Sequence, residues 1–331
     1  MKYNLLNNIS KLKFFLIRFS GEEENIVNDA KMFSKTFRDI YTSTEYKTLK
    51  QNLLKGLDRK SITTVNRILK RVSLFLKNNQ KVFLRESIEF YNVKTADKYK
   101  QSVLKTDGEN WFYEGYVLPR RHFNNQIFWD KYFMEEFKTL DKIRQKDILD
   151  VGGFIGDSAI LFEKYTDAKV RVYEPVESNY KDLIKTIKLN NSEKIIPYQF
   201  ALGSQETEMY INNFESTGVG ATLRKDRDNY PGNVREKIKI KTLDEVVKEE
   251  NLQIGLIKVD VEGAEQDFLA GAMETIKTQK PALLLAIYHT GEDFFEIKTK
   301  IENLNLGYKF KIRKATKDRI IDDTVLICEV L

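Results

Sequence analysis

A glycine loop between a strand-like run and a helix-like run most constrains the fold of this chain. The loop, Asp150-Val-Gly-Gly-Phe-Ile-Gly-Asp157, follows the apolar run 147–149 and opens the helix-like run 158–162. Glycines in such a turn let backbone approach a ligand, and the N–H groups at the helix start point toward it. A dinucleotide fingerprint needs glycines at i, i+2 and i+5, but those offsets from Gly152 hold no further glycine. The spacing therefore disfavours a dehydrogenase.

From Lys146 onward, strand-like and helix-like runs alternate. This alternation predicts an α/β fold with a parallel sheet covered on both faces, over residues 146–331. The last strand-like runs lie close together, so we expect an antiparallel terminal hairpin. Between about residues 203 and 241 the pattern loosens, and we expect an insertion near the site. The expected strands are 147–151, 170–174, 195–201, 237–241, 255–260, 282–288, 308–313 and 323–330, and the expected helices are 157–165, 177–189, 243–250, 263–277 and 292–304.

The region before this alternation is basic. Residues 1–110 hold 22 Lys+Arg and 12 Asp+Glu, whereas the remainder holds 33 and 37. We predict a helical basic accessory domain over residues 1–105, in which Ser61 caps a helix with an apolar stripe along 62–76. A solvated basic face is one reading of the charge, and weak association with an anionic membrane surface is the other. No nucleic-acid recognition motif accompanies the charge, so nucleic acid is not an expected partner.

An aromatic-rich connecting segment or lid is predicted over residues 106–145. Its aromatic side chains gather in 111–129, together with two adjacent arginines. Aromatic rings with polar tips suit sugar faces, and arginines suit phosphate or carboxylate. We therefore expect Tyr116, Arg120 and Arg121 to contact a substrate. The alternative is a strap that only packs the first domain on the second.

The chain has one cysteine, Cys328, within an apolar run, and no stretch of about 18 apolar residues. A disulfide framework is excluded, and the thiol is expected in the core. Without a transmembrane run or a secretory signal pattern, we expect a cytoplasmic protein.

Acidic or small residues mark the ends of the first three strands, where doubly wound sheets bind ligands. Asp150 ends the first strand and Glu174 ends the second. A carboxylate at the second position can accept hydrogen bonds from both hydroxyls of a ribose. Ala201 ends the third, and a small residue there admits an adenine ring. The expected cofactor-binding residues are Asp150, Gly152, Gly153, Gly156, Asp157, Glu174 and Ala201.

A second polar cluster is expected two strands further along the chain. Lys258, Asp260 and Glu262 alternate along a strand and its end, which sends them to one face. Buried charges are costly unless they pair or meet a polar substrate. The next strand ends in Tyr288 and His289, and an unperturbed imidazole suits proton abstraction near neutral pH. A purely structural cluster is the alternative.

Together these motifs resemble the FkbM family of S-adenosylmethionine (SAM)-dependent methyltransferases. The resemblance covers roughly residues 110–331 and departs at Gly153, where the family often has alanine. It implies a Rossmann-like seven-stranded sheet, SAM as cofactor, and O-methyl transfer to a saccharide that is nucleotide- or carrier-linked. The matching runs are the glycine loop, Tyr173-Glu174-Pro175, Ala201-Leu202-Gly203, Thr242–Glu245 and Ile257–Glu265, and Tyr288-His289 with Glu292-Asp293 is similar to glycan-modifying members.

The resemblance implies a catalytic site of Lys258, Asp260, Glu262 and His289, with Tyr288 as a substrate contact. A sugar hydroxyl needs a base within reach, and His289 is the first choice and Asp260 the second. Lys258 would orient a carboxylate or stabilise a developing alkoxide.

Three questions stay open at this stage. Asp260, Glu262 and His289 are acceptable Mg²⁺ or Mn²⁺ ligands but also work through hydrogen bonds, so a divalent metal stays unassigned. The rival functions are a lipid or polyketide O-methyltransferase and a SAM-binding scaffold without catalysis. The oligomeric state, including a homo-oligomer, is not decided by the sequence.

Overall fold

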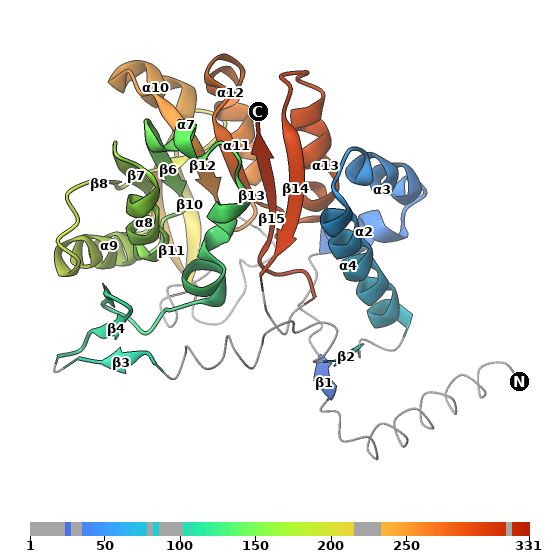
Figure 1. The fold of residues 1–331 in the computed structure, drawn as a ribbon, viewed down its shortest axis with the longest axis horizontal. Helices are drawn as coiled ribbons and strands as arrows, with labels where there is room; N and C mark the ends of the chain where they lie inside the picture. Colours follow the sequence, from blue (N-terminus) through green and yellow to red (C-terminus); the bar gives the residue numbers. More distant parts are fainter. Residues whose placement is uncertain are drawn as a thin grey trace, which may run out of the picture.

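The computed structural model describes residues 24–27, 35–77, 82–85, 102–106, 108–214, 233–315 and 320–331. Its central sheet consists of β6 (Asp147–Val151), β7 (Val170–Tyr173), β8 (Ile195–Tyr198), β12 (Ile254–Val259), β13 (Ala282–Ala286), β14 (Lys309–Lys314) and β15 (Thr324–Glu329). These seven strands lie in the order β14-β15-β13-β12-β6-β7-β8 (Figure 1). Strand β15 runs antiparallel to both neighbours, and the pairs from β13 to β8 are parallel. The predicted α/β sheet and terminal hairpin are confirmed.

Helices cover both faces of this sheet because successive strand residues point to opposite sides. Leu149 and Val151 belong to a core with α10 (Leu243–Glu250), α11 (Glu265–Gly271), α12 (Met273–Gln279) and α13 (Gly291–Glu302). Ile148 belongs to the opposite core, with α7 (Leu140–Arg144), α8 (Asp157–Phe162) and α9 (Glu177–Leu189). Cys328 is fully buried, as expected.

Two expected elements are interrupted. The expected helix 263–277 is broken at Ala272 into α11 and α12. At the end of α11, a Cβ on Gly271 would lie 1.9 Å from the carbonyl oxygen of Gly203, so two backbones touch there. The expected strand 195–201 ends at residue 198 as β8.

The expected strand 237–241 lies outside the central sheet. It is the end of β11 (Asn233–Lys241), which pairs with β10 (Thr207–Phe214) and with β9 (Ala201–Leu202) in a three-stranded sheet. This small sheet is the insertion expected between residues 203 and 241. Residues 215–232 of that insertion lie outside the described part.

The basic N-terminal region contributes three helices, α2 (Lys35–Thr42), α3 (Tyr46–Leu54) and α4 (Arg59–Lys77), at the β14 side of the sheet (Figure 1). Most of the predicted stripe of α4 is buried, and its end residues Ile62 and Leu76 are half-buried. Phe37 of α2 packs against Phe294 of α13 with ring centroids 5.2 Å apart. The region also has a two-stranded sheet of β1 (Glu24–Val27) and β2 (Val82–Arg85). The limits of an accessory domain stay a prediction.

The expectation that Ser61 caps α4 is wrong. The helix begins at Arg59, and the Ser61 N–H donates to Asp58 Oδ1 at 2.7 Å, so Asp58 supplies the capping oxygen. Ser61 is buried instead, and its Oγ accepts from the Ile312 N–H at 2.8 Å and from Arg313 Nη1 at 2.9 Å. Its hydroxyl therefore joins α4 to β14.

The aromatic-rich segment follows as β3 (Leu104–Lys105), β4 (Trp111–Tyr113) and β5 (Tyr116–Leu118), then the π-turn η1 (Asn125–Trp129) and η2 (Lys131–Glu136). We call residues 111–136 the strap. Lys131, Tyr132 and Phe133 are successive left-handed residues with φ of 48°, 51° and 56°. Such a conformation costs free energy in any residue with a Cβ, so tertiary contacts must hold it.

None of the helices that the structure describes combines the length and apolar composition of a membrane span.

Candidate active site

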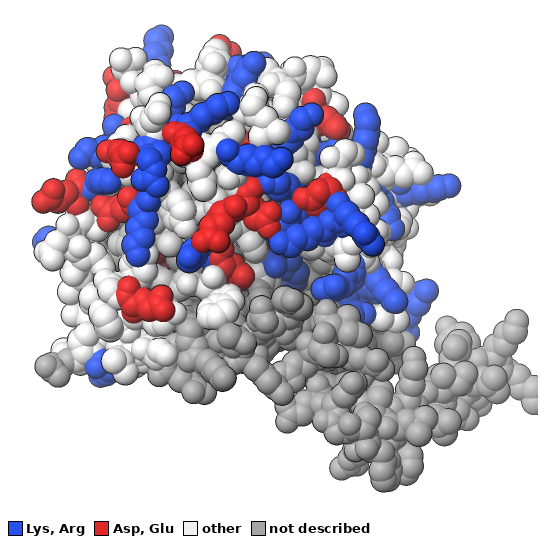
Figure 2. Space-filling model, in the orientation of Figure 1, with Lys and Arg blue, Asp and Glu red and all other residues white. Residues whose placement is uncertain are grey.

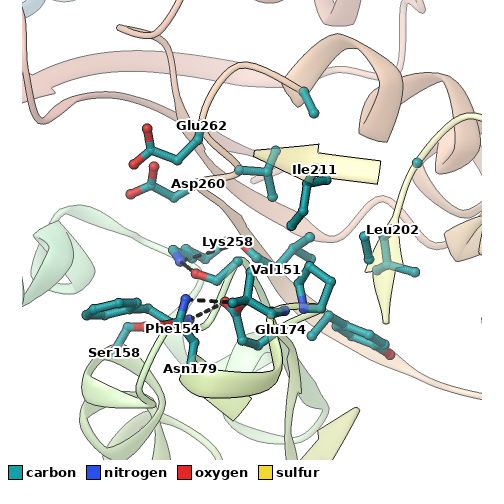
Figure 3. A pocket seen from close by; sticks show the side chains of 18 of the residues that line it. Val151, Phe154, Ser158, Glu174, Asn179, Leu202, Ile211, Lys258, Asp260 and Glu262 are labelled. Carbon is teal, nitrogen blue, oxygen red and sulfur yellow. Dashed lines mark hydrogen bonds between the residues drawn. The ribbon is translucent and has the colours of Figure 1, made fainter. Parts of the chain in front are cut away.

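A cavity of about 600 Å³ lies at the carboxyl ends of β6, β7 and β12. This volume is in the range of small-molecule sites, and the position is where doubly wound sheets bind ligands. Figure 3 shows Glu174 and Asn179 on one side of it and Asp260 and Glu262 on the other. The small β9–β10–β11 sheet adds an apolar wall of Ala201, Leu202, Met209, Ile211, Ile238 and Ile240.

The glycine loop is shaped by close approach to neighbouring strands. Gly152 has φ +76°, and a Cβ there would lie 2.0 Å from the Asp260 carbonyl oxygen. At Gly153 a Cβ would lie 2.0 Å from Val172 Cγ1, so the glycine that departs from the family is matched to the valine beneath it. Gly156 precedes α8 in a left-handed conformation. Only glycine fits the first position without moving the strand end beside it.

A buried ion pair supports this loop from below. Lys258 Nζ lies 2.8 Å from Asp150 Oδ1 and donates to the Gly152 carbonyl oxygen at 2.8 Å. Ser158 Oγ donates to Asp150 Oδ2 at 2.5 Å. Burial opposes the charge on Lys258, but the Asp150 and Asp260 carboxylates outweigh it and raise the lysine pKa. Asp150 thus lies beneath the loop, outside the cavity lining, while Lys258 reaches the lining.

Glu174 reaches the cavity from the end of β7. Its carboxylate accepts from the Phe154 N–H at 2.9 Å, the Val176 N–H at 3.0 Å and Asn179 Nδ2 at 3.4 Å (Figure 3). Burial raises the pKa of Glu174 to about 7, although these hydrogen bonds and Lys258 act in the opposite direction. A carboxylate has about four lone-pair positions and three are used here, so at least one remains for a donor on a ligand.

At the other end of the cavity, two tyrosine hydroxyls hold Asp260. Tyr132 donates to Oδ2 at 2.9 Å and Tyr288 to Oδ1 at 3.3 Å. Tyr132, Tyr288, Asp260 and Glu262 all line the cavity. The left-handed turn of the strap is what brings Tyr132 to Asp260. Sequence reasoning placed Asp260, Glu262 and Tyr288 here but missed Tyr132.

His289 lies behind these carboxylates. Its Nε2 is 3.5 Å from Asp260 Oδ1 and 3.8 Å from Glu262 Oε2, and its Nδ1 is 2.8 Å from Glu265 Oε1. Burial opposes protonation, but Glu265, Glu262 and Asp260 outweigh it and raise the pKa of His289 to about 10. The surrounding carboxylates therefore favour the charged form of the imidazole. It is not among the cavity-lining residues within the described chain.

Glu265 is a site residue that sequence reasoning left out. It is 1% exposed and also accepts from the Val261 N–H at 3.0 Å. Its place in the run 257–265 was the available signal. Asp260, Glu265 and His289 offer ligand atoms within 4.8 Å of one another, a donor set that suits a divalent cation. The His289–Glu265 hydrogen bond explains the same proximity without an ion, so the metal stays unassigned.

The strap contributes different residues from those predicted. Arg120 pairs with Asp182 at 2.5 Å, Arg121 lies over the Trp111 ring at 5.3 Å, and the Tyr116 ring packs against Phe128. None of these three predicted contacts is among the described lining residues. The strap residues that do line the cavity are His122, Asn124, Gln126, Ile127 and Tyr132.

Comparison with known proteins identifies a methyltransferase domain in this chain. Residues 150–310 match the model of the methyltransferase FkbM domain. A protein described as methyltransferase 1 of Beauveria bassiana is 24% identical over 174 residues, which cover 47% of this chain and 70% of that relative.

Among solved structures, the fold is similar to that of the crystal structure of methyltransferase FkbM from Methylobacillus flagellatus. The TM-score is 0.55 at 17% sequence identity, and the match covers 88% of this chain and 60% of that one. The glycine loop, the strand order and the matched domain agree on one assignment. Residues 150–310 of the chain therefore form a methyltransferase domain of the FkbM family.

Proposed function

We propose that the protein transfers a methyl group from SAM to a hydroxyl of a saccharide. The observation that carries this proposal is the Asp260 carboxylate, which faces the cavity and is fixed by the Tyr132 and Tyr288 hydroxyls. A sugar hydroxyl is a poor nucleophile until its proton leaves, so a base in reach is required. Tyrosine rings and carboxylates together suit the mixed apolar and hydroxyl faces of a sugar.

Asp260 is the proposed base, in place of the first choice, His289. A protonated imidazole behind Asp260 and Glu262 cannot accept a proton, but it attracts both carboxylates and holds them at the cavity. SAM, when bound, supplies an electrophilic methyl group. The acceptor O–H proton passes to Asp260 as the oxygen forms its bond to that methyl, and S-adenosylhomocysteine (SAH) leaves. Holding the hydroxyl in line with the sulfonium supplies much of the rate.

The other residues bind and position. Glu174 accepts from the ribose hydroxyls, the glycine loop holds the methionine part, and Ala201 admits the adenine ring. Lys258 is occupied by Asp150 and the Gly152 carbonyl oxygen, so it supports the loop in this proposal. If a divalent cation binds at Asp260 and His289, chelation with EDTA lowers activity. Full activity after chelation would reject a role for a metal.

The first test is calorimetric titration with two SAM analogues, SAH and sinefungin, whose ammonium group stands where the sulfonium carries its methyl. If Asp260 faces that position, sinefungin binds more tightly than SAH, and Asp260→Asn lowers this preference roughly tenfold while sparing SAH affinity. Asp267→Asn, also on the cavity lining, is the matched control. No binding of either analogue would reject every SAM-based function, including the silent scaffold.

The acceptor is tested by mass spectrometry of surface glycans from cells with and without the protein. Loss of one methyl increment from a glycan supports the saccharide, and an unchanged glycan profile with a changed lipid or polyketide favours the second candidate. The Asp260, Glu262 and His289 cluster is intact, which speaks against a scaffold without catalysis. A cytoplasmic location is part of the proposal and rests on the single buried thiol.

The basic helices are proposed to contact an anionic surface weakly. Residues 35–77 hold 11 Lys+Arg and 3 Asp+Glu. Figure 2 shows basic side chains over this part of the face and acidic ones interspersed elsewhere. Co-sedimentation with liposomes tests this contact. Binding that does not change with the content of anionic lipid would reject the proposed contact.

A further inference from the structure

The carboxylates and the lysine among the described lining residues all come from outside the strap. The carboxylates of the cavity come from the methyltransferase domain, among them Asp157, Glu174, Asp260 and Glu262. Lys258 is the one lysine among the described lining residues, none of which is arginine, and it is held by Asp150. A ligand carboxylate in this cavity therefore meets uncharged N–H donors, which come from the glycine loop and from the strap.

Gln126 is the strap residue best placed for this role. It lines the cavity, is 2% exposed, and its Nε2 has no hydrogen-bond partner among the described residues. A buried amide donor without a partner is costly, so a ligand oxygen would relieve it. Gln126 belongs to the π-turn η1, whose first turn is capped by Asn124 Oδ1 accepting from the Ile127 N–H at 2.9 Å.

The strap is fastened at the glycine-loop end of the cavity. His122 Nδ1 lies 2.8 Å from Asp157 Oδ2, and the imidazole packs edge-on against the Phe154 ring with centroids 4.9 Å apart. The π-turn η1 packs against α8, the helix that the loop opens. Gln126 thus lies near the part of the cavity assigned to the methionine moiety of SAM.

We propose that the strap binds the amino-acid end of SAM, with the Gln126 side-chain amide donating to the methionine carboxylate. This inference rests on the proposed function and adds a donor-binding residue to it. The hydrogen bond is charge-assisted, which makes it stronger than a bond between neutral groups. The strap then belongs to the methyl-donor site through Gln126 and to the proposed base through Tyr132, so one segment orders both halves of the cavity.

The test compares two ligands that differ only in the carboxylate, SAH and decarboxylated SAH, by calorimetry on the full chain. Wild-type protein should bind SAH at least roughly tenfold more tightly than the decarboxylated ligand. Gln126→Met keeps the side-chain length and removes the amide, so it should weaken SAH by a similar factor and leave the decarboxylated ligand unchanged. Gln205→Met makes the same change at an exposed residue of the cavity lining outside the strap and should preserve the wild-type ratio.

Each other outcome overturns a defined part of the argument. Equal loss of both ligands in Gln126→Met means that the residue acts on the fold or the adenosine part, and the carboxylate assignment fails. Equal affinity of wild type for both ligands overturns the proposal even if the variant does not fold. No binding of either ligand by wild-type protein rejects the SAM-based function itself, which separates that failure from failure of this inference.

Discussion

The binding of SAM or SAH is predicted to be linked to a proton on Glu174. Burial moves the pKa of this carboxyl from its ordinary value of 4.5 to about 7, against the hydrogen bonds from Phe154 and Val176. The ribose hydroxyls donate to an ionised carboxylate and so favour its charged form. Ligand binding should therefore expel a proton wherever Glu174 is protonated in the free protein, which is below about pH 7.

The magnitude follows from the shift. A change of about 2.5 pKa units is worth about 3 kcal/mol between the two protonation states. The folded chain binds more protons than the unfolded chain between pH 4.5 and 7, so this group's contribution to stability is full below pH 4.5 and is lost as the pH rises to 7. SAH affinity changes with pH in the opposite direction, because the ligand binds the ionised carboxylate. The ionised fraction of Glu174 in the free protein, and with it the SAH affinity, should fall about tenfold from pH 8 to pH 6.

The assay is titration calorimetry of SAH across this range, in two buffers with different ionisation enthalpies. The difference between buffers counts the protons released. Glu174→Gln should bind SAH more weakly and without this pH slope. His122 also lines the cavity, so His122→Asn is the control and should keep the slope.

Equal SAH affinity at pH 6 and pH 8 with no proton release would refute the reasoning. A slope that persists in Glu174→Gln would assign the proton to another group. Lys258 is the charged side chain that most opposes the raised pKa, so any rearrangement of its pair with Asp150 would also move the slope.

Three further predictions concern the framework of the domain. Gly152→Ala should abolish SAH binding and lower the free energy of unfolding by at least about 2 kcal/mol, because the added Cβ would meet the Asp260 carbonyl oxygen. Calorimetry and urea unfolding measure the two effects, and normal SAH binding would contradict the prediction. Lys258→Met should cost about 3–5 kcal/mol in urea unfolding by leaving Asp150 buried and unpaired, and adding Asp150→Asn should recover part of the loss. Lys280→Gly should raise the free energy of unfolding by up to about 1 kcal/mol, because Lys280, directly after α12, has the left-handed φ of 49° that glycine adopts without strain. Thermal unfolding checks this, and a lower Tm than in the wild type would contradict it.

The central sheet was predictable because its signals are local. Strands β6, β7 and β12 are mostly apolar runs followed by a glycine or an acidic residue, and such runs form parallel strands when helices separate them. The neighbouring ends of β12 and β13 follow from that topology, which is why Asp260, Glu262 and His289 could be brought together from sequence alone. The glycine loop was recognisable for the same reason.

The missed features depend on contacts between distant segments. Tyr132 reaches Asp260 across 128 residues, through a left-handed turn that no glycine announces. Arg120 looked like an anion site but finds a carboxylate partner on α9, in Asp182. The charge on His289 is set by Glu265 and its neighbours, so its protonation follows from three-dimensional proximity rather than from residue type.

The contact between Ser61 and β14 has a consequence for solubility. Strand β14 is the outermost strand of the central sheet, and an open strand edge is a template for pairing with another molecule. The Ile312 N–H, on that edge, is taken up by the Ser61 hydroxyl, and α4 lies along the strand. The N-terminal helices thus protect the sheet from self-association, and shortening the chain to the methyltransferase domain would leave that edge open to aggregation.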